Sequence, residues 1–156
     1  MDRTRTHLEI INILYCTSMT MFLCHVILSF HTYNEDYFGG ILPMPRFKIR
    51  HGWYTLGYFH CYPDAPLGTT ETIEISDFYD YTNEQLRDII IHEMIHYYLY
   101  YTGEDPNCRH GKAFKRMANQ FNTRYGMNIT PTIDISRMKS SENANKISKF
   151  FFKIFN

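Results

Sequence analysis

The sequence predicts an α+β fold: an N-terminal helix, a small three-stranded antiparallel sheet, and two further helices in succession. Residues 10–34 are largely apolar and contain no Asp, Glu, Lys or Arg, which indicates a buried helix. Three short runs between residues 46 and 76 favour strands, and two segments with helix-capping signals follow them. A chain of 156 residues with 44% hydrophobic residues suits one globular domain.

The first helix is expected through much of residues 7–33, ending before the turn signal Gly39-Gly40. Its run MTMFLCHVILSF, residues 19–30, leaves a signal peptide or a membrane anchor through residues 10–30 open. Polar residues interrupt the apolar run, and no small-x-small cleavage site follows it. We therefore favour a core helix and a cytoplasmic protein.

The three strand candidates share β-favouring residues. Residues 46–50 (RFKIR) and 72–76 (TIEIS) alternate polar with apolar side chains, and residues 53–61 (WYTLGYFHC) are rich in aromatic ones. His51-Gly52 is a turn signal between the first two runs. We expect the three strands to form an antiparallel sheet.

The two later helices have recognisable ends. Thr82 is a good N-cap, and Gln85 three residues later completes a capping-box pattern. That helix should stop at Gly103. After a short loop, the last helix should cover roughly residues 110–125 and end at Gly126.

The capped helix carries His92, Glu93 and His96 within the apolar run IIIHEMIHYY. Residues four apart lie on one helix face with Cβ atoms about 5–6 Å apart, so both imidazoles can reach one metal ion. Glu93 points to the side of the pair, where it can reach a water molecule as the general base of HExxH metallopeptidases does. The alternative is a pair of core histidines with other partners.

A catalytic zinc site needs a third protein ligand and an open position for water. The position six residues after the second histidine is Thr102, which excludes a metzincin arrangement. The candidate is His110, which the intervening loop can deliver at the start of the last helix. Gly111 would let that helix pack closely against the helix that carries the other two ligands. We expect one Zn²⁺ ion on these three histidines.

The segment HEMIHYYLYYTGEDPNCRHGKAFKRMANQFN resembles the SprT-like (Spartan-type) zinc metalloproteases, in which HExxH, a loop and H-G-x-x-F follow one another. The residues that match are His92, Glu93, His96, His110, Gly111 and Phe114. The resemblance extends over about residues 30–128. It implies a zincin-like arrangement and peptide-bond hydrolysis, with zinc on the three histidines and Glu93 as catalytic base.

Spartan-type members cleave proteins crosslinked to DNA, so the resemblance raises a role in DNA–protein crosslink repair. The zinc ribbon of several SprT proteins is absent, because no cysteine follows Cys108. The four cysteines form no CxxC pattern, as is typical of reduced thiols in a cytosolic protein. We divide the chain into an N-terminal helical segment (1–29), a SprT-like metalloprotease domain (30–130) and a C-terminal tail (131–156).

The strand at residues 72–76 directly precedes the helix with the HExxH motif. We expect it to be a sheet edge that pairs with an extended protein or peptide substrate through main-chain hydrogen bonds, with Thr72, Glu74 and Ser76 as binding residues. The alternative is an ordinary internal strand.

Charge is uneven along the chain. Residues 1–102 carry 6 basic and 12 acidic side chains, whereas residues 103–156 carry 10 basic and 4 acidic ones. A DNA backbone is therefore a possible partner, with Arg46, Lys48 and Arg50 on one strand and Lys112 on the last helix as contacts. The alternative is a solvated surface without a partner.

The function that these patterns favour is a zinc-dependent endopeptidase, a hydrolase. Closed structural zinc sites usually have four ligands and favour cysteine, whereas three histidines and a nearby glutamate favour catalysis. Two alternatives stay open: a non-catalytic zinc-containing domain that binds DNA or protein, and a membrane-anchored metallopeptidase.

Overall fold

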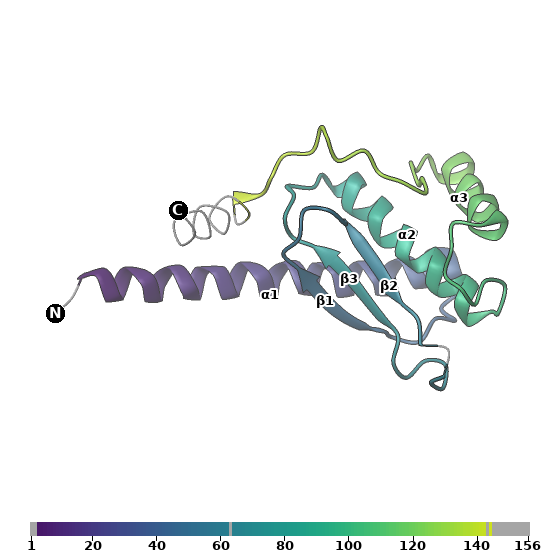
Figure 1. The fold of residues 1–156 in the computed structure, drawn as a ribbon, viewed down its shortest axis with the longest axis horizontal. Helices are drawn as coiled ribbons and strands as arrows, with labels where there is room; N and C mark the ends of the chain where they lie inside the picture. Colours follow the sequence, from purple (N-terminus) through teal and green to yellow (C-terminus); the bar gives the residue numbers. More distant parts are fainter. Residues whose placement is uncertain (1–2, 63, 143, 145–156) are drawn as a thin grey trace.

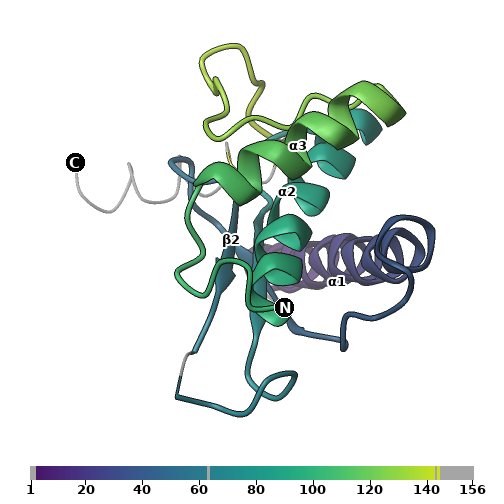
Figure 2. The ribbon, with the colours of Figure 1, turned by 90° about the vertical axis from the view of Figure 1, so that its right-hand side faces the viewer.

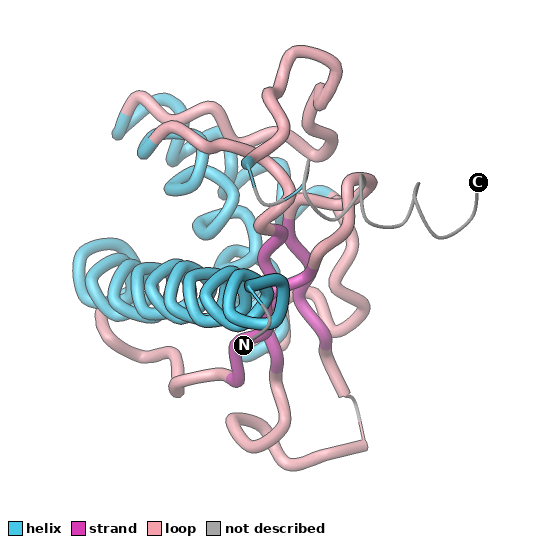
Figure 3. The backbone as a smooth tube through the Cα atoms, turned by 90° about the vertical axis from the view of Figure 1, so that its left-hand side faces the viewer, coloured by secondary structure: helices cyan, strands magenta, loops and turns pink. Residues whose placement is uncertain are grey.

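The computed structural model describes residues 3–62, 64–142 and 144. Within them the helices pack on one side of a small sheet, which confirms the α+β class (Figures 1 and 3). The elements in chain order are α1 (Arg3–Phe38), β1 (Arg46–Arg50), β2 (Gly57–His60), β3 (Thr72–Ser76), α2 (Asn83–Tyr101) and α3 (Lys112–Tyr125).

The sheet is mixed, so the expected antiparallel sheet is wrong. Its strand order is β1-β3-β2, in which β3 pairs in parallel with β1 and antiparallel with β2. Residues 51–56 do not make a hairpin turn; they cross the end of β3. There the Ser76 N–H donates to the Leu56 carbonyl at 2.8 Å, and the Ser76 hydroxyl donates to the Gly52 carbonyl at 2.7 Å.

The core lies between the sheet and the helices. Phe47, Ile73 and Phe59 stand side by side across the three strands. From the helical layer, the fully buried Phe30 of α1 meets Phe47 with ring centroids 5.4 Å apart and Tyr97 of α2 with centroids 6.4 Å apart. Aromatic packing thus joins α1, α2 and the sheet.

Helix α1 runs unbroken through residues 29 and 30, and its buried Val26 and Phe30 belong to the core. It ends before Gly39 and Gly40, which have φ of +69° and +70° as the turn signal predicts. Its C-terminal half packs on the domain, and its N-terminal part extends beyond the sheet (Figure 1). No helix among the described residues combines the length and the apolar character needed to cross a membrane.

The predicted helix ends are confirmed for α2 and α3. The Gln85 N–H donates to the Thr82 hydroxyl at 3.2 Å, and the Thr82 N–H donates to the Gln85 side chain at 2.9 Å, which is a complete capping box. Helix α2 gives way to Gly103 at φ +77°, and α3 is capped by Gly126 in the left-handed conformation.

Residues 127–142, here called the return segment, lead from the end of α3 back over the N-terminal half of α2 (Figure 1). The Asn122 side chain holds the segment's start through two hydrogen bonds with the Ile129 backbone, at 2.9 and 2.7 Å. Its far end forms a β-bridge between Tyr79 and Ser140. Of the expected C-terminal tail, residue 143 and residues 145–156 lie outside the described residues.

Candidate metal centre

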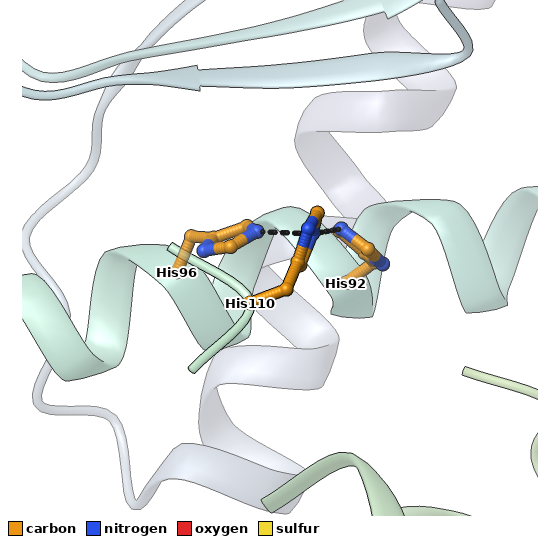
Figure 4. A group of neighbouring side chains, drawn as sticks. All are labelled: His92, His96 and His110. Carbon is orange, nitrogen blue, oxygen red and sulfur yellow. Dashed lines mark hydrogen bonds between the residues drawn. The ribbon is translucent and has the colours of Figure 1, made fainter. Parts of the chain in front are cut away.

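Three imidazoles converge beside the sheet. His92 and His96 come from consecutive turns of α2, and His110 comes from the loop directly before α3. The Nε2 atom of His110 lies 2.9 Å from Nε2 of His92 and 3.0 Å from Nε2 of His96 (Figure 4). The structure therefore brings together the three histidines that the sequence proposes as ligands.

The loop between α2 and α3 is folded back by one carboxylate. Asp105 accepts hydrogen bonds from the backbone N–H groups of Asn107, at 3.1 Å, and Arg109, at 3.0 Å. Cys108 between them has a φ of 51°, in the left-handed region. This tight turn places His110 over the α2 pair.

Phe114, the last residue of the H-G-x-x-F motif, supports all three imidazoles. Its fully buried ring lies with its centroid 4.7 Å from that of His92, 4.6 Å from that of His96 and 4.7 Å from that of His110. Gly111 plays no comparable part: a Cβ atom there would have nothing within 4 Å, so the expected close helix packing at this glycine is wrong.

The three histidines have lowered pKa values, which favours binding of a cation. Burial, followed by repulsion from the other histidines, lowers the pKa of His92 to about 3, and burial with His110 lowers that of His96 to about 4. Burial and Lys115 also lower the pKa of His110. At neutral pH the three rings are therefore uncharged, and their nitrogens can act as ligands.

The hydrogen-bonding capacity of the cluster is incomplete without a cation. His110 Nε2 has either one proton or one lone pair, so it cannot satisfy its contacts with both His92 and His96. The three ligand nitrogens lie within 4.8 Å of one another. An ion that accepts a lone pair from each resolves the conflict, and imidazole nitrogen is a ligand for zinc, copper, iron and nickel.

Glu93 is buried against strand β2. Burial raises the pKa of this carboxyl group to about 8, although a hydrogen bond with the Phe59 backbone opposes the shift. A Cβ atom on Gly57 would lie 2.6 Å from Glu93 Oε1, so only glycine allows this approach. No local sequence pattern connects Gly57 with Glu93, which lies 36 residues later, so this contact could not be predicted from the sequence.

A cavity of about 480 Å³ opens over these groups. One wall is β2 with the residues before it, the floor is α2 with Glu93 and the histidines, and the opposite wall is residues 131–135 of the return segment. Helix α2 lies between α3 and the sheet (Figure 2). The cluster thus faces a space large enough for part of a peptide.

The strand that borders this cavity is β2, so the expectation that residues 72–76 form the substrate-binding edge is wrong. Those residues are β3, the central strand, which is paired on both sides. Thr72 and Ser76 are buried, and Glu74 binds Arg50 at 3.1 Å and His60 at 3.0 Å. A sequence pattern of alternating polarity shows a strand but not its neighbours.

The four basic residues proposed for DNA are spread over two elements. Arg46 and Lys48 are exposed on β1, the sheet edge opposite β2, whereas Arg50 is occupied by Glu74 and by the Tyr54 hydroxyl at 2.9 Å. Lys112 begins α3, which packs on α2. Binding of DNA stays a prediction.

The chain is similar to one family of known proteins. The model of the SprT-like family matches residues 26–134, which is more than half of the chain. No curated protein matches the sequence. The matched range contains the three histidines, Glu93, β2 and the start of the return segment.

Proposed function

Because the chain belongs to the SprT-like family, we propose that it is a zinc-dependent endopeptidase. The observation that carries the proposal is the meeting of three uncharged imidazoles with a buried carboxyl group at the floor of an open cavity. His92, His96 and His110 would hold the ion, and Glu93 would act as general base.

Zinc in a three-histidine site supplies Lewis acidity, which acidifies a water molecule and polarises a carbonyl group. Glu93 accepts the proton of the attacking water on its carboxylate and can pass it to the departing amine. The positive charge of an ion on the three histidines would oppose the burial that raises the pKa of Glu93, and so would favour the ionised carboxylate that a base requires. The Phe59 backbone and the close contact at Gly57 keep the carboxylate in place.

Strand β2 offers an edge for an extended substrate. The Ser76 N–H donates to the Leu56 carbonyl, so by the alternation of antiparallel pairs the backbone groups of Gly57 and Phe59 point away from β3. The Phe59 N–H already binds Glu93, and a peptide that pairs with the other outward groups would lie along the cavity. Main-chain pairing of this kind tolerates many substrate sequences.

A purely structural zinc site is the competing function. Structural sites are usually closed by four protein ligands. In the described part of the chain the cluster has three, and it opens on the cavity. These features favour catalysis.

Metal analysis combined with a proteolysis assay tests the proposal. Wild-type protein should bind one zinc ion and cleave casein, Glu93→Gln should keep the ion and lose cleavage, and His110→Ala should lose both. His31→Ala, on the exposed side of α1, is the matched control and should behave as wild type. Wild-type cleavage by Glu93→Gln, or no cleavage by the zinc-loaded wild type, would refute the proposal.

A further inference from the structure

The opposite wall of the cavity is held in place at both ends. Next to Ile129, the Asn128 N–H donates to the Asp88 carboxylate of α2 at 2.9 Å. At the far end, the Asp80 N–H donates to the Lys139 carbonyl at 2.9 Å and the Ser141 N–H to the Phe78 carbonyl at 2.8 Å. Hydrogen bonds on both sides therefore hold residues 131–135 in place as part of the cavity wall.

This wall carries apolar side chains. Ile133 and Ile135 line the cavity together with Ile89, which lies one helical turn before Glu93. Ile89 is buried, but Ile133 is 39% exposed although it is a large hydrophobic residue. Covering apolar surface of this kind with a ligand is favourable, because the surface is removed from water.

Charge is scarce along the rest of the cavity. Among the described residues that line it, Glu93 is the one acidic side chain, and no lysine or arginine is present. A charged substrate side chain entering beside the isoleucines would lose its water without gaining a partner, which is costly. An apolar side chain meets neither problem.

We propose that Ile89, Ile133 and Ile135 form a subsite beside the metal centre that takes an aliphatic or aromatic side chain of the substrate. The proposal rests on the peptidase function proposed above and adds a preference to it. Main-chain pairing with β2 tolerates any sequence, whereas this subsite selects at one position next to the scissile bond. Discrimination by such pockets is modest, about 10–200-fold.

Cleavage of a mixed peptide library, read by mass spectrometry, tests the preference. Wild type should favour Leu, Ile, Phe or Met over Asp and Lys at one position near the cut by about tenfold or more. Ile133→Asp should abolish or invert this preference. The matched control is Ile41→Asp, another exposed isoleucine outside the cavity, which should keep the wild-type profile.

Binding separates this proposal from the peptidase function. The Glu93→Gln protein, loaded with zinc, should bind a fluorescein-labelled Leu-containing peptide more tightly than its Asp-containing counterpart, and adding Ile133→Asp should remove the difference. Selective binding without wild-type cleavage would support the subsite and refute the peptidase. Cleavage with no preference, a preference unchanged by Ile133→Asp, or no selective binding would overturn the subsite.

Discussion

Burial disfavours the ionised form of the Glu93 carboxyl group. Its carboxyl group has a pKa raised from 4.5 to about 8, so ionisation is harder in the folded than in the unfolded chain. Well below pH 4.5 the carboxyl group is neutral in both the folded and the unfolded state, so it costs no stability. As the pH rises from 4.5 to 8, the free energy of unfolding falls, and the full cost of burying the charge is reached above pH 8. Functional groups often cost stability in this way.

We therefore expect metal-free Glu93→Gln to be more stable than the metal-free wild type at pH 8, by about 1–4 kcal/mol, and nearly equal to it at pH 5. Urea unfolding in the presence of a chelator measures the difference. Glu104→Gln, at an exposed ion pair with Arg116, is the control and should change little at either pH. An equal gain at both pH values would show that ionisation of Glu93 is not the cause.

Gly57 determines where that carboxylate lies. In Gly57→Ala the new Cβ would stand 2.6 Å from Glu93 Oε1, so the carboxylate must move. A displacement of about 1 Å costs about 100-fold in rate, so we expect casein cleavage to fall by about that factor while zinc content is retained. Gly111→Ala, which meets nothing within 4 Å, should stay close to wild type. Unchanged cleavage by Gly57→Ala would show that Gly57 does not position the Glu93 carboxylate.

At the scale of single elements, the free edge of β2 makes a prediction about substrates. Methylating the backbone nitrogen of a peptide removes a donor without changing its side chains, so pairing with the outward carbonyl groups of Gly57 and Phe59 should weaken. In a series of peptides that each carry one N-methyl group, we expect one or two to bind the Glu93→Gln protein about tenfold more weakly in a competition assay. This factor is what the loss of a hydrogen bond of roughly 1 kcal/mol predicts. Equal competition along the series would exclude edge pairing.

Asn122 of α3 makes a second prediction at this scale, because its amide satisfies both backbone groups of the buried Ile129. Asn122→Ala leaves them without these partners, which should cost about 1–3 kcal/mol of unfolding free energy. Chemical denaturation measures the loss, and the exposed Asn119→Ala serves as control. A loss no larger than that of the control would mean that Ile129 is held by other contacts.

For the whole molecule, the cluster joins α2 to the loop that leads into α3. A ligand that binds the folded state alone stabilises it by mass action, by about 4 kcal/mol at 1,000 times its dissociation constant. Zinc should therefore raise the melting temperature, and a chelator should reverse the effect. His110→Ala should melt at a temperature that zinc does not change, whereas a shift equal to that of wild type would place the ion elsewhere.

The sequence by itself determined the helices, their ends and the residues of the cluster. A capping box and a pair of histidines four residues apart are local: each needs only the geometry of one helix. The family resemblance, confirmed by the match over residues 26–134, linked His110 to this pair. The helices and two of the three clustered histidines could therefore be predicted from short stretches of sequence.

Only the tertiary structure decided which strand borders the cavity, how closely Gly57 approaches Glu93, and that the return segment forms the far wall. Each of these contacts joins segments far apart in the chain. Their pairing depends on the packing of α1, α2 and the sheet around aromatic residues such as Phe30 and Tyr97, and no short-range periodicity encodes it. The chemistry of the site is local in the sequence, but its shape is a property of the fold.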